Sequence, residues 1–222
     1  MADRSKSQRS KSQRQDPAVP QQYEGWAWGY DLLWARYVNQ TLPVLQRAAR
    51  VRPNEEVLDL ACGTGEFERR VLAAVPRARL VGVDLASAMV ERARAKIGGH
   101  PGVRFEQADA HALPFERNVF DAVVCANTFH YFTHPAQVLR ETRRVLRPGG
   151  RLVLLDWCRD FWTCRIMDAV LRRLDPAYRH CYTQAELRAL LDAASFRVHT
   201  SFRYRFDLVW GMMVARATAE PS

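Results

Sequence analysis

Short apolar runs alternate with amphipathic stretches through the middle of the chain. The apolar runs predict five strands, over residues 56–60, 79–83, 103–107, 120–126 and 150–156. Between them, apolar residues recur at helical spacing over residues 66–74, 87–97 and 135–146, and Arg147-Pro148-Gly149-Gly150 predicts the end of the last helix. This alternation is typical of a parallel sheet covered by helices.

The alternation breaks after residue 156. Residues 159–174 form an amphipathic helical stretch within an insertion over 159–182, and Thr183 with Glu186 forms a capping box that predicts a helix over 183–193. Two strands follow, over 196–206 and 207–217. Because almost no residues separate them, they must form an antiparallel hairpin, since a parallel pair needs a long crossover.

The first fifty residues divide into two segments. Residues 1–20 contain the repeat RSKSQRSKSQ and no apolar residue between positions 4 and 16. Such a segment cannot bury enough surface to offset the entropy of ordering it, so we expect a disordered basic tail. Residues 21–50 are dense in aromatic and apolar positions at helical spacing and predict a helical segment. Residues 51–222 form the expected domain.

Composition narrows the class of protein. The chain has 222 residues, 48% of them hydrophobic, so it can bury a core of ordinary size. Its apolar runs are shorter than the roughly 18–20 residues of a membrane span, and no apolar stretch follows the first charged residues, so we do not expect a secreted protein. Five cysteines without a CxxC pair favour a reducing compartment, and we expect a cytoplasmic protein. The formal charge of +9 is a weak sign of nucleic-acid binding, because part of it lies in the tail.

The sequence LDLACGTGEFE, residues 58–68, contains part of a nucleotide-binding loop. In the dinucleotide fingerprint GxGxxG, the third glycine lets the following helix approach the strand, and pyrophosphate lies at the helix N-terminus. Gly63 and Gly65 supply the first two glycines, but Glu68 occupies the third position. A bulky acid there disfavours pyrophosphate and therefore a dinucleotide-dependent oxidoreductase.

Three acids stand at the ends of the first three predicted strands: Asp59, Asp84 and Asp109. A carboxylate in the crevice repels phosphate and attracts a cation, and an acid about twenty residues past the glycines can accept hydrogen bonds from ribose hydroxyls. The three acids together predict a ligand with a ribose and positive charge but little phosphate. S-adenosylmethionine, which carries a sulfonium and an ammonium group, fits this description.

The ordered motifs VLDLACGTGEF, VGVDLASAMVERARAK, VRFEQADAHALPF, FDAVVCANTFHYF and ETRRVLRPGGRLVLLD resemble those of class I S-adenosylmethionine-dependent methyltransferases. The chain is most similar to the small-molecule branch that includes ubiquinone and menaquinone biosynthesis methyltransferases. The resemblance implies an α/β fold with a Rossmann-like, seven-stranded, mostly parallel sheet. It also implies a C-terminal antiparallel hairpin, helices on both faces, and a lid formed by the N-terminal helices.

The resemblance also implies the residues that bind the cofactor. Asp59 and Gly63 would meet the methionine part, Gly65 would permit close passage of the chain, and Ala61 would also bind the cofactor. Asp84 would bind the ribose hydroxyls, and Leu85 would lie against the adenine. Asp109 and Ala110 would recognise the adenine edge, Asp109 through the exocyclic amine. Asn127 and Thr128 would line the reactive end. No metal ion is expected.

Methyl transfer from a sulfonium is an in-line displacement, in which alignment alone supplies roughly 7–11 kcal/mol of barrier reduction. A base is needed only if the acceptor loses a proton. His130 and Tyr131, after the fourth strand, are the candidate catalytic residues, with His130 as base or acceptor-positioning group. Further candidates for the pocket or lid are His134, Tyr30, Tyr37, Asp156 and Trp157.

The acceptor stays open. Enzymes that methylate nucleic-acid bases carry an Asp/Asn-Pro-Pro-Tyr/Phe turn, and the corresponding stretch Asn127-Thr128-Phe129-His130 has no proline. This disfavours nucleic acid and favours a small-molecule substrate. The segment DWCRDFWTCRIMDAV departs from the quinone enzymes. Its Cys158 and Cys164, with Cys181 a little later in the chain, suggest an alternative, a soft acceptor such as arsenite held by three thiolates. A non-catalytic cofactor-binding regulator is a further alternative. The oligomeric state is not indicated.

Overall fold

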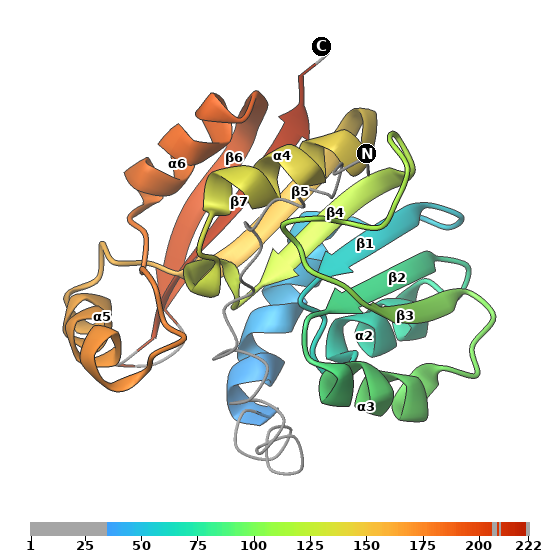
Figure 1. Cartoon of the computed structure of the whole chain (residues 1–222), viewed down its shortest axis with the longest axis horizontal. Helices are drawn as coiled ribbons and strands as arrows, with labels where there is room; N and C mark the ends of the chain where they lie inside the picture. Colours follow the sequence, from blue (N-terminus) through green and yellow to red (C-terminus); the bar gives the residue numbers. More distant parts are fainter. Residues whose placement is uncertain (1–34, 206–207, 209, 221–222) are drawn as a thin grey trace, which may run out of the picture.

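The structure is a computed structural model that describes residues 35–205, 208 and 210–220. Its seven described strands form one sheet with the order β3-β2-β1-β4-β5-β7-β6 (Figure 1). The strands are β1 Glu56–Leu60, β2 Arg79–Asp84, β3 Val103–Gln107, β4 Phe120–Ala126, β5 Leu146–Trp157, β6 Phe196–Arg205 and β7 Gly211–Ala219. The first five pair in parallel, whereas β7 pairs antiparallel with both β5 and β6. The predicted fold class is therefore confirmed.

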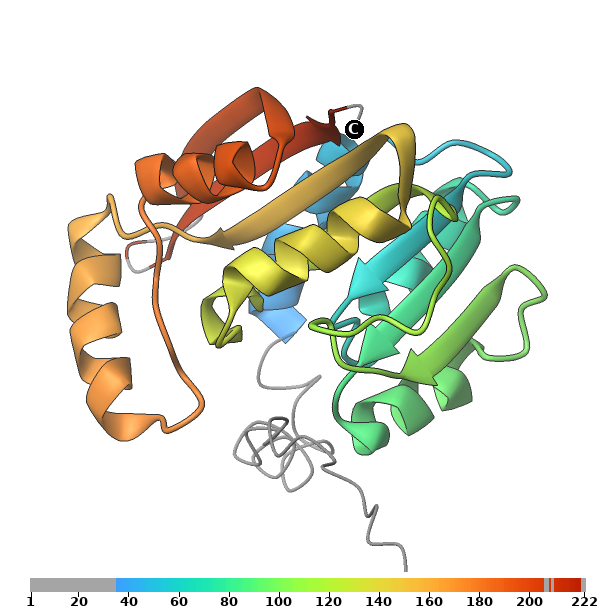
Figure 2. The same cartoon turned by 45° about the horizontal axis from the view of Figure 1, so that its top comes forward.

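Helices cover both faces of the sheet. The helical bounds are residues 35–49, α2 Glu66–Ala74, α3 Ser87–Ile97, η1 Phe129–Tyr131, α4 Pro135–Val145, α5 Trp162–Leu174 and α6 Gln184–Ala193. One core cluster joins the helix of residues 35–49, α2 and α3 to one face, and a second joins α4 and α6 to the other. Figures 1 and 2 show the resulting three layers, with α5 standing beyond the carboxyl end of β5.

Two of the sequence predictions concern helix ends. Thr183 caps α6 as expected, because its hydroxyl accepts from the Glu186 amide and the Glu186 carboxylate accepts from the Thr183 amide. The predicted stop after α4 is also found, with the helix ending at Val145. However, the predicted start of β5 at residue 150 is wrong, since the chain is already extended from Leu146, which pairs with Phe120.

Other boundaries differ by a few residues. The helix predicted over 159–174 begins at Trp162, and β2 extends to Asp84 rather than ending at Val83. The predicted hairpin is antiparallel, but its strands end at Arg205 and resume at Gly211. The sequence pattern could not show this gap, because apolar residues continue through it.

The basic tail of residues 1–20, Tyr30 and the first part of the helical segment 21–50 lie outside the described residues. Within the described part of the chain, no helix combines the length and apolar character required to cross a bilayer.

Candidate cofactor and acceptor site

The carboxyl ends of the five parallel strands meet at one edge of the sheet. The strand order reverses between β1 and β4, which are neighbours in space but are separated in sequence by β2 and β3. In open α/β sheets, ligands bind outside the carboxyl ends of the strands at such a switch point. The predicted site residues lie at or just after these strand ends.

The loop after β1 has an unusual backbone. Ala61, Gly63 and Gly65 have φ values of 57°, 55° and 78°, in the left-handed region that favours glycine. A Cβ on Gly65 would lie 3.0 Å from the Phe105 ring, so this glycine lets the loop pack against β3. A Cβ on Gly63 would meet nothing within 4 Å, so the space beside Gly63 is open to a ligand.

Asp84, at the end of β2, holds the loop after β1 through a hydrogen bond to its backbone. Its Oδ2 accepts from the Gly63 amide at 2.9 Å, and its Oδ1 accepts from the Ala86 amide at 3.0 Å. Burial raises the pKa of Asp84, although these amide hydrogen bonds oppose the shift. Each carboxylate oxygen has a second lone pair, so Asp84 can still accept from ribose hydroxyls.

Two more acids are buried beneath the loop. Asp59 is 5% exposed, and the pKa of its carboxyl is raised well above its usual value by burial and then by Glu68 and Asp84. Glu68, on α2, is fully buried, and burial raises its pKa to about 8. Neither Glu68 oxygen has a hydrogen-bond partner among the described residues. A cationic ligand beside these acids would offset the energetic penalty of burying them.

From the sequence, Glu68 was interpreted only as a bulky residue in place of the third glycine. In the structure its side chain points inward, where its Oε1 would lie 2.6 Å from a Cβ on Gly82. The available signal was its spacing, because Glu68 lies three and four residues before the buried Val71 and Leu72 on the same helix face.

Asp109 follows β3 and is half-buried. Its Oδ1 accepts from the amide and the Nδ1 of His111, at 2.9 and 2.7 Å, and the imidazole lowers the pKa of the carboxyl. These contacts use one oxygen, and Oδ2 has no partner among the described residues. Leu85, which follows Asp84, is half-buried, and Ala110, which follows Asp109, is buried.

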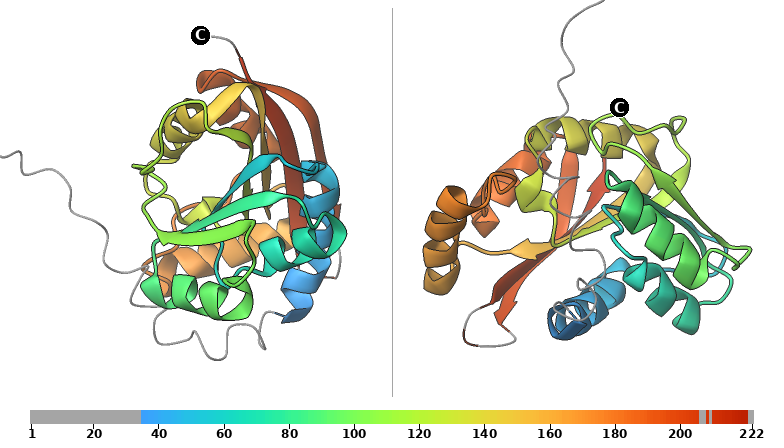
Figure 3. Two further views of the ribbon diagram at one scale, coloured as in Figure 1. Left: turned by 90° about the vertical axis from the view of Figure 1, so that its right-hand side faces the viewer. Right: turned by 60° about the horizontal axis from the view of Figure 1, so that its bottom comes forward.

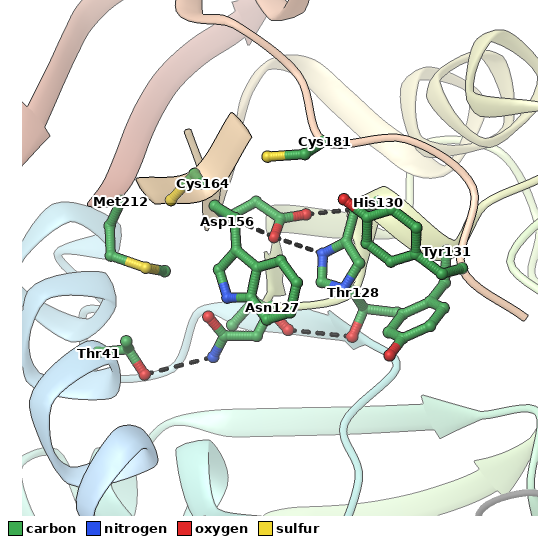
Figure 4. A network of polar contacts seen from close by, with 12 residues as sticks. Thr41, Asn127, Thr128, His130, Tyr131, Asp156, Cys164, Cys181 and Met212 are labelled. Atoms are coloured by element: carbon green, nitrogen blue, oxygen red, sulfur yellow. Dashed lines mark hydrogen bonds and ion pairs between the residues drawn. The ribbon is translucent and has the colours of Figure 1, made fainter. Parts of the chain in front are cut away.

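Asn127 joins the sheet edge to the helix of residues 35–49. The residue has φ 58°, and its amide donates to the carbonyl of Leu155 at 2.8 Å. Its Oδ1 accepts from the Tyr37 hydroxyl at 2.7 Å, and its Nδ2 donates to Thr41 Oγ1 at 3.3 Å. Thr128 donates to the carbonyl of Ala126 (Figure 4). The contacts to Tyr37 and Thr41 fix the orientation of the Asn127 side chain.

His130 lies in η1 and is 2% exposed, so it is not the surface histidine that its loop position suggests. Its Nδ1 lies 2.7 Å from Asp156 Oδ1, and its amide donates to Asp156 Oδ2 at 2.9 Å (Figure 4). In the neutral imidazole, this contact places the proton on Nδ1 and leaves Nε2 as the acceptor. Nε2 is buried and has no partner in the described part of the chain.

Aromatic rings surround the His130 imidazole. It stacks on Trp157 at 4.4 Å between centroids and lies 4.4 Å from the Tyr131 ring and 5.5 Å from the Tyr178 ring. The Trp157 indole donates to the Tyr37 hydroxyl at 2.7 Å, so it also contacts the helix of residues 35–49. Tyr178 is a site residue that the sequence analysis missed, because it lies in a segment without regular structure.

The cysteines form no obvious ligand set. All five are buried thiols, and burial raises the pKa of Cys158 to about 12 and raises those of Cys164 and Cys181. Thiolates are the form that binds soft metalloids, and these thiols resist ionisation. Among the described residues, no three His, Cys, Asp or Glu side chains are arranged to hold a metal ion.

Comparison with known proteins agrees with this geometry. Residues 57–150 match a family model described as "Methyltransferase domain". The demethylmenaquinone methyltransferase of Deinococcus radiodurans is 45% identical over 102 residues, which are 46% of this chain and 42% of that protein. The one from Thermus thermophilus is 40% identical over 132 residues, or 59% and 57% of the two chains. The chain thus spans about half the length of these relatives.

A solved structure shares the fold over nearly the whole chain. A putative methyltransferase from Haloferax volcanii, in complex with the Trm112 methyltransferase activator, has a TM-score of 0.81 and 20% identity, covering 92% of this chain and 98% of that one. The chain therefore shares the fold of that protein, and residues 57–150 match the model of a methyltransferase domain. The expected resemblance to S-adenosylmethionine-dependent methyltransferases, and to their quinone-biosynthesis branch, is confirmed.

Proposed function

We propose that this protein transfers a methyl group from S-adenosylmethionine to a small-molecule acceptor. The observation that carries the proposal is the buried Asp59 at the topological switch point, beside a loop with open space at Gly63. An uncompensated acid in this position favours a ligand that presents a cation there. The similarity of residues 57–150 to methyltransferase domains supports the same conclusion.

The residues at the edge fit this cofactor. Asp59, Ala61, Gly63 and Gly65 are proposed to hold its methionine part, and Asp84 its ribose. The remaining contacts are proposed for Leu85, Asp109, Ala110, Asn127 and Thr128. The bound cofactor supplies an electrophilic methyl group on a sulfonium. The protein orients the reactants and excludes water, which is the main source of rate enhancement in such a displacement.

His130 is proposed as the base or positioning group, with Tyr131 beside it. Asp156 holds the imidazole in one tautomer, so Nε2 is the atom able to accept a proton from an acceptor. A buried polar atom without a partner destabilises the protein by about 1–3 kcal/mol, which an acceptor hydroxyl would relieve. The surrounding rings favour a flat, aromatic acceptor.

We propose a quinone-type acceptor, because two relatives are named demethylmenaquinone methyltransferases. The arsenite alternative is not favoured, because burial raises the pKa of Cys158, Cys164 and Cys181. Nucleic acid is disfavoured by the sequence after β4. Because all five cysteines are buried thiols, we propose that the protein acts in the cytoplasm.

The test is cofactor binding followed by transfer. Calorimetry should show S-adenosylmethionine binding that is weakened at least roughly tenfold in Asp84→Ala, through the loss of charge-assisted hydrogen bonds. Incubation with radiolabelled S-adenosylmethionine and a panel of phenols and quinols should then identify the acceptor. Absence of binding would refute the proposal, and binding without transfer to any extract component would favour the regulatory alternative.

A further inference from the structure

A groove lies away from the carboxyl edge of the sheet. It has a volume of about 500 Å³ and runs between the last turns of the helix of residues 35–49 and one face of the β6–β7 hairpin. Figure 3 shows this helix beside the two C-terminal strands. Its apolar walls include Val44, Ala48, Phe202 and Val214, and its polar lining includes Arg47, Arg50, Tyr204 and Arg216. None of the cofactor-site residues named above lines it.

The polar lining is strongly cationic. Arg47, Arg50 and Arg216 make no ion pair with any described residue, and nor does the neighbouring Arg52. Glu55, whose charge acts on Arg216, is already held by Arg151 through contacts of 2.9 and 2.5 Å. Burial, followed by Arg50, Arg151 and Arg52, lowers the pKa of Arg216. At Arg216, the repulsion from each of these three arginines is larger than the opposing effect of Glu55.

Two residues that line the groove also carry a buried polar atom without a partner in the described part of the chain. Arg216 Nε and the Tyr204 hydroxyl are inaccessible to solvent and have no hydrogen-bond partner among the described residues. Both belong to adjacent strands of the hairpin, on the face that the helix covers. Both groups can donate a hydrogen bond, and both belong to residues that line the groove.

We infer that this groove binds a small amphiphilic anion, a carboxylate or phosphate monoester with an apolar body. The anionic group would lie among Arg47, Arg50 and Arg216, where guanidinium groups can bind oxyanions with paired hydrogen bonds. The apolar body would lie against Val44 and Phe202. The volume falls within the usual range for small-molecule sites. The groove is separate from the cofactor site and does not depend on the proposed methyl transfer.

The test is calorimetry of the full chain with hexyl phosphate, hexanoate, inorganic phosphate and hexanol. Hexyl phosphate or hexanoate should bind, inorganic phosphate should bind more weakly, and hexanol should not bind. Arg216→Gln and Arg47→Gln should each weaken binding roughly tenfold or more, because each removes a charge-assisted contact. Arg47 lies on the helix surface, so its variant is informative even if Arg216→Gln disturbs the hairpin.

Arg140→Gln is the matched control, since it removes the same charge from an exposed position on α4. It should change the affinity by less than about twofold, as expected for a distant surface charge. Saturating S-adenosylmethionine should not displace hexyl phosphate. The inference is refuted if neither amphiphilic anion binds at millimolar concentration, or if Arg140→Gln weakens binding as much as the two groove variants do.

Discussion

Replacement of Glu68 by glutamine should stabilise the protein, and more so as the pH rises. Burial raises the pKa of Glu68 from 4.5 to about 8. Between these values the folded protein keeps a proton on Glu68 that the unfolded chain releases, so the wild type loses stability as the pH rises. Glutamine has nearly the same shape and is neutral in both states, so this loss disappears.

The size of the effect follows from the same shift. Each pH unit above 4.5 contributes about 1.4 kcal/mol, so at pH 7.5 the variant gains up to about 4 kcal/mol in free energy of unfolding. The gain should be small at pH 5 and level off above pH 8. Because neither Glu68 oxygen has a hydrogen-bond partner among the described residues, the substitution breaks no side-chain hydrogen bond with them.

Urea denaturation of both proteins at pH 5, 6, 7 and 8 measures this difference. Glu66→Gln, two residues earlier on α2, is the control, because its effect on stability should have the opposite sign. The hydrogen bond between Glu66 and Arg69 lowers the pKa of Glu66, so the ionised side chain stabilises the folded protein. That variant should lose a few tenths of a kcal/mol at neutral pH and nothing at low pH. Parallel stability curves for wild type and Glu68→Gln would show that Glu68 is not a buried, protonated acid.

Three further variants test the site and its supports. Gly65→Ala should lower the free energy of unfolding by about 1–3 kcal/mol in urea, because alanine is strained at φ 78° and its Cβ would lie 3.0 Å from Phe105; an unchanged midpoint would contradict this. Thr183→Ala should lower it by about 1 kcal/mol through loss of the cap, whereas Thr183→Ser should not. Tyr37→Phe should lower it by about 1–3 kcal/mol and weaken S-adenosylmethionine binding, because the Asn127 and Trp157 side chains each lose a partner; calorimetry with unchanged affinity would separate Tyr37 from the site.

The sequence predicted the elements well where periodicity and turn chemistry were strong. The strand over residues 56–60 and the helix capped by Thr183 match the structure because a buried strand and a capping box are local signals. The extended start of β5 at Leu146 was missed because it depends on pairing with Phe120, a contact between distant residues.

The candidate site likewise contains residues that local sequence signals identify and residues that only distant contacts bring together. Asp59, Asp84 and Asp109 could be placed at strand ends from the sequence, because parallel strands bring their carboxyl ends to one edge. The inward direction of Glu68 and the pairing of His130 with Asp156 depend on three-dimensional packing. The groove at Arg216 could not be found from sequence, because its arginines are distributed over a helix and a hairpin far apart in the chain.

The helix of residues 35–49 connects two regions that would otherwise be independent. Tyr37 contacts Asn127 at the carboxyl edge, and Arg47 lies in the groove ten residues later, about 15 Å along the helix axis. If an anion in the groove changes the affinity for S-adenosylmethionine through this helix, thermodynamic reciprocity requires the cofactor to change the affinity for the anion by the same factor.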